Sequence, residues 1–157
     1  MLKIRYATQE DLSALQVLYD AQVEYMAALQ PMQYKPAKAD PSFIKREICY
    51  PHGGVLVAAD DNDTIWGFIS FYLTENKNNS FRVPHRFCEL ENLYVLPQKR
   101  KCGIGTLLFN SAIHYAEENK VNSIQFMTLA ENKRMQRLAE KSGFRYMEHV
   151  YIRESLL

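Results

Sequence analysis

A short cationic loop with two glycines contains the residues whose types best suit anion binding. The loop consists of Arg100, Lys101, Cys102, Gly103, Ile104 and Gly105, followed by Thr106. A strand-like apolar pattern ends at Val95 before it, and a helical pattern follows it. A helix N-terminus leaves N–H groups free and has about half a positive charge, and glycines let a phosphate approach the backbone. The pattern predicts a phosphate-binding loop, although the two glycines alone would fit an ordinary turn equally well.

Two carboxylates lie in the strand pattern upstream of this loop. Glu89 and Glu91 are two residues apart, so a regular strand points both from the same face. A carboxylate in such a position can accept a proton, directly or through a water. Repulsion between the two groups and partial burial would raise at least one pKa toward neutrality. Acids are also ordinary on the solvent side of a sheet edge, and the pattern alone leaves both interpretations open.

Hydrophobic periodicity predicts the elements that position these residues. We expect strands at residues 2–7, 55–59, 64–74, 86–95, 122–129 and 144–153. We expect helices at residues 9–29, 42–49, 104–119 and 132–142, with Gly143 as the C′ residue of the last. Residues 75–84 are polar and predict an exposed connection. Alternating strands and helices in the second half require a parallel pair, so the fold class is α/β with a mixed sheet.

Length and composition bound the class of protein. The 157 residues suit one domain, 47% of them are hydrophobic and 24% are charged, which favours a globular protein over a disordered one. A net charge of +1 gives no support for nucleic-acid binding, and no apolar run is long enough to span a membrane. The three separated cysteines and the scattered histidines predict neither a disulfide framework nor a metal site. A cytoplasmic protein is expected, because the opening residues read as a strand and not as a signal peptide.

Four pieces of the chain, in order, resemble the GNAT superfamily of acyl-CoA-dependent N-acyltransferases. The family's Arg/Gln-x-x-Gly-x-Gly/Ala pattern is matched by Arg100, Gly103 and Gly105. The other pieces are residues 93–97, Asn132 with the helix pattern up to Gly143-Phe144, and residues 4–8 with Asp11-Leu12. The resemblance implies a single domain over 1–157, with a splayed parallel strand pair in a central mixed sheet flanked by about four helices.

The resemblance also implies where acetyl-CoA would bind as co-substrate, with no metal. In the family, the pantetheine arm bonds the strand backbone at positions that match Leu93, Tyr94 and Val95. The pyrophosphate would sit on N–H groups of the loop residues Arg100, Lys101, Cys102, Gly103, Ile104, Gly105 and Thr106. Asn132 would bond the pantetheine arm, since its amide both donates and accepts; the alternative interpretation is a helix cap alone. Candidates for the outer phosphate are Lys99, Lys101, Lys133 and Arg134.

The chemistry implied by the resemblance is acetyl transfer to a primary amine by direct attack in a ternary complex. Glu89 matches the position where several family members have a general base, and Glu91 would help or orient the amine. The backbone N–H near Val95 would stabilise the thioester oxygen. Many family members have a tyrosine where this chain has Ala139, so Tyr146 or a water would protonate the thiolate, or it leaves unprotonated. This replacement keeps open an alternative: a non-catalytic acyl-CoA-binding sensor or regulatory module.

The expected acceptor is a small-molecule or peptide amine. Its pocket is expected between residues 18–43 and the last strand, where aromatic and acidic side chains suit a cation. These side chains are Tyr19, Asp20, Glu24, Tyr25 and Tyr34. The short C-terminal end would leave a sheet edge that a second subunit can complete, so a homodimer is expected.

Overall fold

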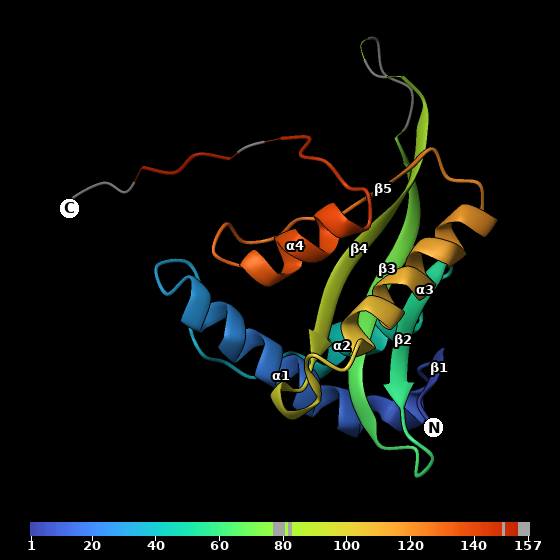
Figure 1. Cartoon of the computed structure of the whole chain (residues 1–157), viewed down its shortest axis with the longest axis vertical. Helices are drawn as coiled ribbons and strands as arrows, with labels where there is room; N and C mark the ends of the chain where they lie inside the picture. Colours follow the sequence, from blue (N-terminus) through green and yellow to red (C-terminus); the bar gives the residue numbers. More distant parts are fainter. Residues whose placement is uncertain (77–80, 82, 149, 154–157) are drawn as a thin grey trace. The chain divides into compact units, whose positions relative to one another are not determined.

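The computed structural model describes residues 1–76, 81, 83–148 and 150–153, and it divides into two compact units, Met1–Met127 and Thr128–Leu157 (Figure 1). The strands of the first unit are β1 (Lys3–Tyr6), β2 (Gly53–Ala59), β3 (Ile65–Asn76), β4 (His85–Val95) and β5 (Ser123–Gln125). Its α-helices are α1 (Leu12–Leu29), α2 (Pro41–Ile48) and α3 (Ile104–Glu118). The 3-10 turns η1 (Gln9–Asp11) and η2 (Pro97–Lys99) precede α1 and follow β4, and the second unit contains α4 (Lys133–Lys141).

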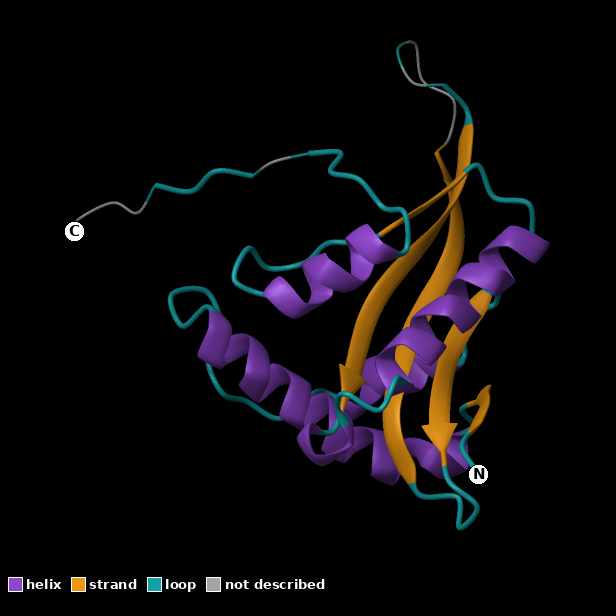
Figure 2. Cartoon of the chain, viewed as in Figure 1, coloured by secondary structure: helices purple, strands orange, loops and turns teal. Residues whose placement is uncertain are grey.

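The strands form one mixed sheet in the order β1-β2-β3-β4-β5 (Figure 2). The first three neighbouring pairs are antiparallel and β4 pairs with β5 in parallel, which confirms the predicted fold class. The parallel pairing runs only from Phe87↔Ser123 to Glu89↔Gln125, whereas β4 continues to Val95. The parallel pair therefore separates after Glu89, as the resemblance implied.

Helices cover both faces of the sheet and bury alternate residues of β3. Phe68 stacks on Tyr19 of α1 with ring centroids 4.1 Å apart, and both side chains are buried. Phe71 points to the opposite face and contacts Tyr115 of α3, with centroids 5.1 Å apart. Because residues 68 and 71 lie on opposite faces of one strand, the sheet has a helix α1 face and a helix α3 face.

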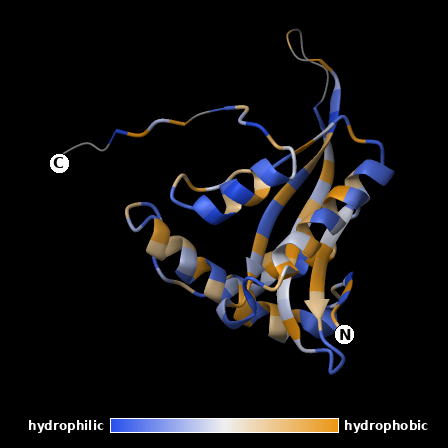
Figure 3. Ribbon diagram, viewed as in Figure 1, coloured by the Kyte–Doolittle hydropathy of each residue, from blue (hydrophilic) through white to orange (hydrophobic). Residues whose placement is uncertain are grey.

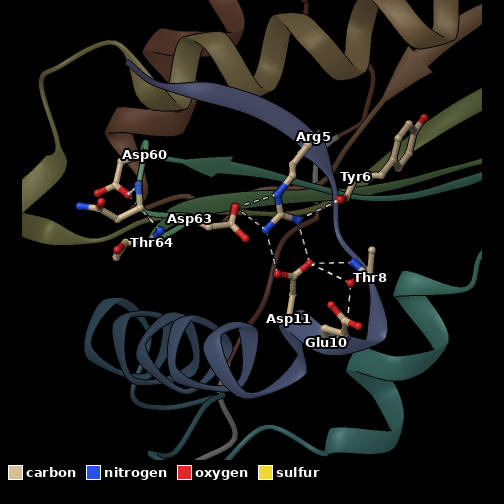
Figure 4. Close-up of polar contacts among 9 residues, drawn as sticks. Arg5, Tyr6, Thr8, Glu10, Asp11, Asp60, Asp63 and Thr64 are labelled. Carbon is tan, nitrogen blue, oxygen red and sulfur yellow. Dashed lines mark hydrogen bonds and ion pairs between the residues drawn. The ribbon is translucent and has the colours of Figure 1, made fainter.

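Arg5 of β1 ties the sheet to the start of the first helix (Figure 4). Its guanidinium donates two hydrogen bonds to Asp11, of 2.8 and 2.9 Å, and two to Asp63 in the turn between β2 and β3. Asp11 also accepts from the N–H of Thr8, completing a capping box at η1. The Arg5 hydrogen bonds lower the pKa of Asp11, and the Asp11 carboxylate raises the pKa of Arg5.

The second unit consists of α4 and the segments around it. Asn132 caps α4 through a hydrogen bond from Met135 N, and Gly143 follows the helix with φ +82°, which confirms it as the C′ residue. The helix is mostly hydrophilic (Figure 3), and none of its side chains is fully buried.

Near the C-terminus, one strand prediction was wrong and another was too long. Residues 144–148 and 150–153 form no strand, and residue 149 lies outside the described residues. β5 covers Ser123–Gln125 and not the predicted 122–129. Apolar side chains of the final segment, including Met147, Val150 and Tyr151, are mostly exposed. A strand with a period-two pattern is stabilised by burying one of its faces, and these exposed side chains bury none.

The other predicted elements are present with small shifts at their ends. β3 runs to Asn76, so the predicted connection starts later than residue 75, and its residues 77–80 and 82 lie outside the described part of the chain. No helix within the described residues is both long enough and apolar enough to cross a membrane.

Candidate active site

The outer edge of β4 presents backbone groups beyond the point where β5 ends. Leu96 N donates to Trp66 O (3.0 Å), so the peptide groups of Leu96 face β3. Antiparallel pairs alternate between bonded and non-bonded positions, so the N–H and C=O groups of Leu93 and Val95 face the other edge. The carbonyl of Val95 is occupied, because it accepts from Arg100 Nε (2.8 Å). The Leu93 groups and the Val95 N–H are thus positioned to bind an amide-containing ligand.

The loop after β4 ends at a helix N-terminus. Gly103 is the N-cap of α3 with φ +80°, a conformation that favours glycine, and Lys101 also has a positive φ of 64°. The helical ladder begins at Leu107 N, which donates to Gly103 O (2.9 Å). The N–H groups of residues 104–106 therefore lie outside the ladder and point toward solvent beyond the helix end. This arrangement suits an anion.

Arg100 anchors the loop to the end of β4. Besides the bond to Val95, its guanidinium lies 5.2 Å from the ring centroid of Tyr25 and 5.1 Å from that of Tyr94. Tyr94 is buried and directs its side chain to the helix α1 face. Lys99 is similarly engaged, with Nζ 4.4 Å from the ring of Trp66. Lys101 is the exposed cation of the loop, so the positive charge nearest the helix end depends on it more than the sequence pattern suggested.

Glu89 lies where the parallel strands separate. Its partner on β5 is Gln125, whose Nε2 donates to Glu89 Oε2 (2.7 Å), and its partner on β3 is Tyr72. The side chain is half-buried on the helix α1 face. Burial raises the pKa of Glu89, the Gln125 hydrogen bond opposes the rise, and the charge of Glu91 adds to it.

Glu91 is the extra residue of a β-bulge. The register passes from Phe71↔Leu90 to Ser70↔Asn92, so Glu91 has no direct partner on β3. It is exposed and accepts a hydrogen bond from Tyr50 Oη (2.6 Å). The ring of Tyr50 lies 5.1 Å from that of Tyr72, which pairs with Glu89. The structure therefore brings Glu89 and Glu91 to one face, where they lie near two tyrosines.

A third carboxyl group, Glu47 of α2, was missed by the sequence reasoning. It is completely buried and contacts Tyr19 Oη, and Asn92 Nδ2 donates to its Oε1 (2.9 Å). Burial and a hydrogen bond with Glu91 raise the pKa of Glu47 to about 8. The signal was available, because Glu47 continues the helical stripe of Ile44 and Ile48.

A family model described as Acetyltransferase (GNAT) family matches residues 15–144. The chain belongs to this family. It is 26% identical over 143 residues to the uncharacterized N-acetyltransferase YhfO of Bacillus subtilis, which covers 91% of this chain and 89% of that protein.

Solved structures of GNAT fold share the same architecture. A mutant of the BH1408 protein from Bacillus halodurans matches with a TM-score of 0.91 and 21% identity, covering 98% of this chain and 99% of that one. The aminoglycoside N-acetyltransferase AAC(6')-Iy, solved in complex with CoA, matches with a TM-score of 0.71 and 18% identity, covering 99% and 95% of the two chains. At these identities the likeness shows the fold.

The predicted ligand residues of the second unit have local partners. Asn132 uses Oδ1 to cap α4, accepting from Met135 N (3.2 Å), so its amide N–H groups are what it could offer to a ligand. Lys133 Nζ donates to Ala130 O (2.7 Å), while Arg134 is exposed. Ala139 is half-buried in α4, and its carbonyl accepts from Phe144 N (3.0 Å).

Two expectations about the acceptor region change with the structure. Tyr19 is a core residue, and Asp20 accepts from Lys38 Nζ, Gln16 Nε2 and Ala39 N, which makes it a structural anchor. The expected wall formed by a last strand is absent from residues 144–148 and 150–153. Within the described residues, no group of three histidine, cysteine or acidic side chains is arranged to hold a metal ion.

Proposed function

We propose that this GNAT protein transfers the acetyl group of acetyl-CoA to a primary amine by direct attack in a ternary complex. The observation that carries the proposal is the end of β4, where three features meet. These are the outward peptide groups of Leu93 with the N–H of Val95, the carboxylates Glu89 and Glu91, and the α3 N-terminus that follows the loop. The first suits an amide-containing arm, the second an ammonium group and the third a phosphate.

The residues present fit acetyl-CoA. Leu93 and Val95 would bond the amide groups of the pantetheine arm along the outer edge of β4, and the N–H groups of residues 104–106 would hold the pyrophosphate. Lys101 would add charge at the same end, and Arg100 would keep the loop in place through its bond to Val95.

Glu89 is the proposed general base. Its raised pKa suits a group that accepts a proton near neutral pH, whereas Glu91 on the bulge would orient the incoming ammonium. The amine nitrogen then forms a bond to the thioester carbon, and the carbon–sulfur bond breaks. The Val95 N–H would stabilise the charge that develops on the carbonyl oxygen. The thiolate leaves as such or takes a proton from water.

An acetyl-transfer assay over a panel of primary amines tests this function. The wild type should release free CoA thiol in an amine-dependent manner. Glu89→Gln should lower kcat by about 100-fold, the usual contribution of a general base, with unchanged affinity for CoA. Glu117→Gln, an exposed acid on α3, is the control and should match the wild type. A Glu91→Gln variant that alone loses turnover would transfer the base role to Glu91.

The alternative, a non-catalytic acyl-CoA sensor, is favoured by one observation. Ala139 offers no hydroxyl group to the leaving thiolate, at the position where many relatives have a tyrosine. Calorimetry with acetyl-CoA separates the two functions: tight binding without turnover on any amine would establish the sensor. Turnover with any amine would establish the enzyme.

The compartment and the assembly belong to the same proposal. Three free cysteines, two of them exposed, suit the reducing conditions of the cytoplasm. A homodimer would follow if a second subunit pairs with the free edge of the sheet. Sedimentation analysis at several protein concentrations measures the assembly directly.

A further inference from the structure

We propose that Glu47 is a positioning residue that donates a hydrogen bond to Glu91 and thereby holds this carboxylate oriented toward the acceptor amine. The inference rests on the proposed function for the role of Glu91, but not for the pairing of the two groups. Glu47 touches no solvent and so cannot reach the substrate itself.

The surroundings of Glu47 determine where its proton lies. Its Oε1 accepts from Asn92 Nδ2 (2.9 Å), and its Oε2 contacts Tyr19 Oη. Asn92 is itself held in place, because it also donates to Ser70 Oγ (3.1 Å) and accepts from Gln22 Nε2 (3.2 Å). The geometry thus fixes the carboxyl group from α1, β3 and β4 at once.

No cation compensates a negative charge at this position. Within residues 1–76, 81, 83–148 and 150–153, no lysine, arginine or histidine forms an ion pair with Glu47. A buried carboxylate without a counter-ion costs several kcal/mol, so the neutral acid is the stable form. Its single O–H then needs an acceptor, and the carboxyl group of Glu91 is within hydrogen-bonding range.

Glu91 is the natural acceptor of this proton donor. It lies exposed on the bulge, so its charge is hydrated, and Tyr50 Oη donates to its Oε2 (2.6 Å). With Glu47 protonated, the pair has one negative charge, located on the exposed member. Two donors, Tyr50 and Glu47, then fix the carboxylate in orientation.

The groups that face the pair from the neighbouring elements are few. From α1 comes Tyr19, and from β3 come Ser70 and Tyr72; β4 contributes Glu89 and Asn92. After α2 comes Tyr50, and Arg46 of α2 lies over the ring of Phe43 at 5.0 Å. Burial raises the pKa of Tyr19 and of Tyr50, so both remain neutral donors when Glu47 titrates.

Two variants separate this role from a purely structural one. Glu47→Gln keeps a hydrogen-bond donor for Glu91, and Glu47→Leu fills the same space without one. At neutral pH, Glu47→Gln should keep kcat/KM for the amine within roughly twofold of the wild type. Glu47→Leu should raise KM for the amine about tenfold or more, the loss expected when one hydrogen bond to a charged group disappears. KM for acetyl-CoA should stay constant in both.

Carboxyl-carbon NMR titration of the free protein provides a second measurement that does not depend on turnover. The wild type should show one glutamate that titrates several pH units above the others and is absent from Glu47→Gln. This titration should move to lower pH in Glu91→Gln, because the hydrogen bond and the charge of Glu91 raise the pKa of Glu47.

Each outcome of the two measurements decides something different. Equal losses in both Glu47 variants, with both folded, would show that the carboxylate of Glu47 is itself required and would overturn the inference. An unchanged Glu47 titration in Glu91→Gln would also overturn it. A coupled titration in a protein that acetylates no amine would refute the proposed function and leave the pairing of the two carboxyl groups intact.

Discussion

The buried acid Glu47 predicts an unusual dependence of stability on pH. Its pKa is raised from 4.5 to about 8 in the folded protein, first of all by burial. Between these values the folded state keeps the proton and the unfolded state has lost it. The free energy of unfolding therefore falls as the pH rises through this window. Below and above the window, Glu47 contributes no pH dependence. Glu47→Gln removes the titration and should remove this part of the pH dependence.

The magnitude follows from the size of the pKa change. At 1.36 kcal/mol per pH unit, the full shift corresponds to about 5 kcal/mol, of which about 3 kcal/mol develops between pH 5 and pH 7. Glutamine also has to satisfy Tyr19 and Asn92, and an imperfect hydrogen bond there costs about 1–3 kcal/mol at every pH. The absolute stability of the variant is thus a balance of two effects, whereas its change with pH comes from the titration alone.

Urea unfolding at several pH values, followed by circular dichroism, measures this change. The free energy of unfolding of Glu47→Gln minus that of the wild type should become more positive from pH 5 to pH 7 by about 2–3 kcal/mol. Glu117→Gln, on the exposed side of α3, should show a constant difference near zero. Parallel curves for Glu47→Gln and the wild type would refute the reasoning, because they would mean that Glu47 is ionised in the folded protein.

Three further predictions concern the end of β4 and the loop that follows it. Gly105→Asp should weaken CoA binding, measured by calorimetry, by about 100-fold, because it places a negative charge at the α3 N-terminus. Gly105→Ala is the control and should bind CoA like the wild type, since its Cβ would lie at an ordinary contact distance of 3.7 Å from Val95 Cγ2. Cys102, exposed in the loop, should react with iodoacetamide more slowly when CoA is bound. The exposed Cys49 is the control and should react at the same rate with and without CoA. Equal protection of both thiols by CoA would contradict the loop assignment. Gly67→Ala should destabilise the protein by about 1–3 kcal/mol in urea unfolding, because its Cβ would lie 2.8 Å from the Tyr94 carbonyl oxygen. A variant as stable as the wild type would contradict this, because it would show that the backbones of β3 and β4 can move apart at this position without loss of stability.

Local patterns in the sequence were sufficient to predict the glycine-containing loop and the helix that follows it. The helix start at Ile104 and the C′ position of Gly143 depend on hydrogen bonds and dihedral angles within a few residues. Both are therefore visible in short stretches of sequence. The predicted mixed sheet also follows from local signals, because the order of strands and helices limits the possible connections.

The final segment and β5 were predicted less well, because strand formation depends on a partner segment. The final segment has a strand-like pattern, yet its apolar side chains are exposed and it has no strand pairing within the described residues. β5 is likewise shorter than its pattern suggested, ending at Gln125 where the parallel pair separates. Pairing is a property of two segments, and a single apolar run contains only half of that information.

The sequence by itself determined the family, the loop and the presence of two acids on one strand. Only the tertiary structure decided which groups surround these acids. The bulge places Glu91 beside α2, and the packing of that helix buries Glu47 between Tyr19 and Asn92. These three elements are far apart in the chain, and the proton affinity of a carboxyl group depends on the solvent and charges around it in space. No spacing within the sequence measures that environment.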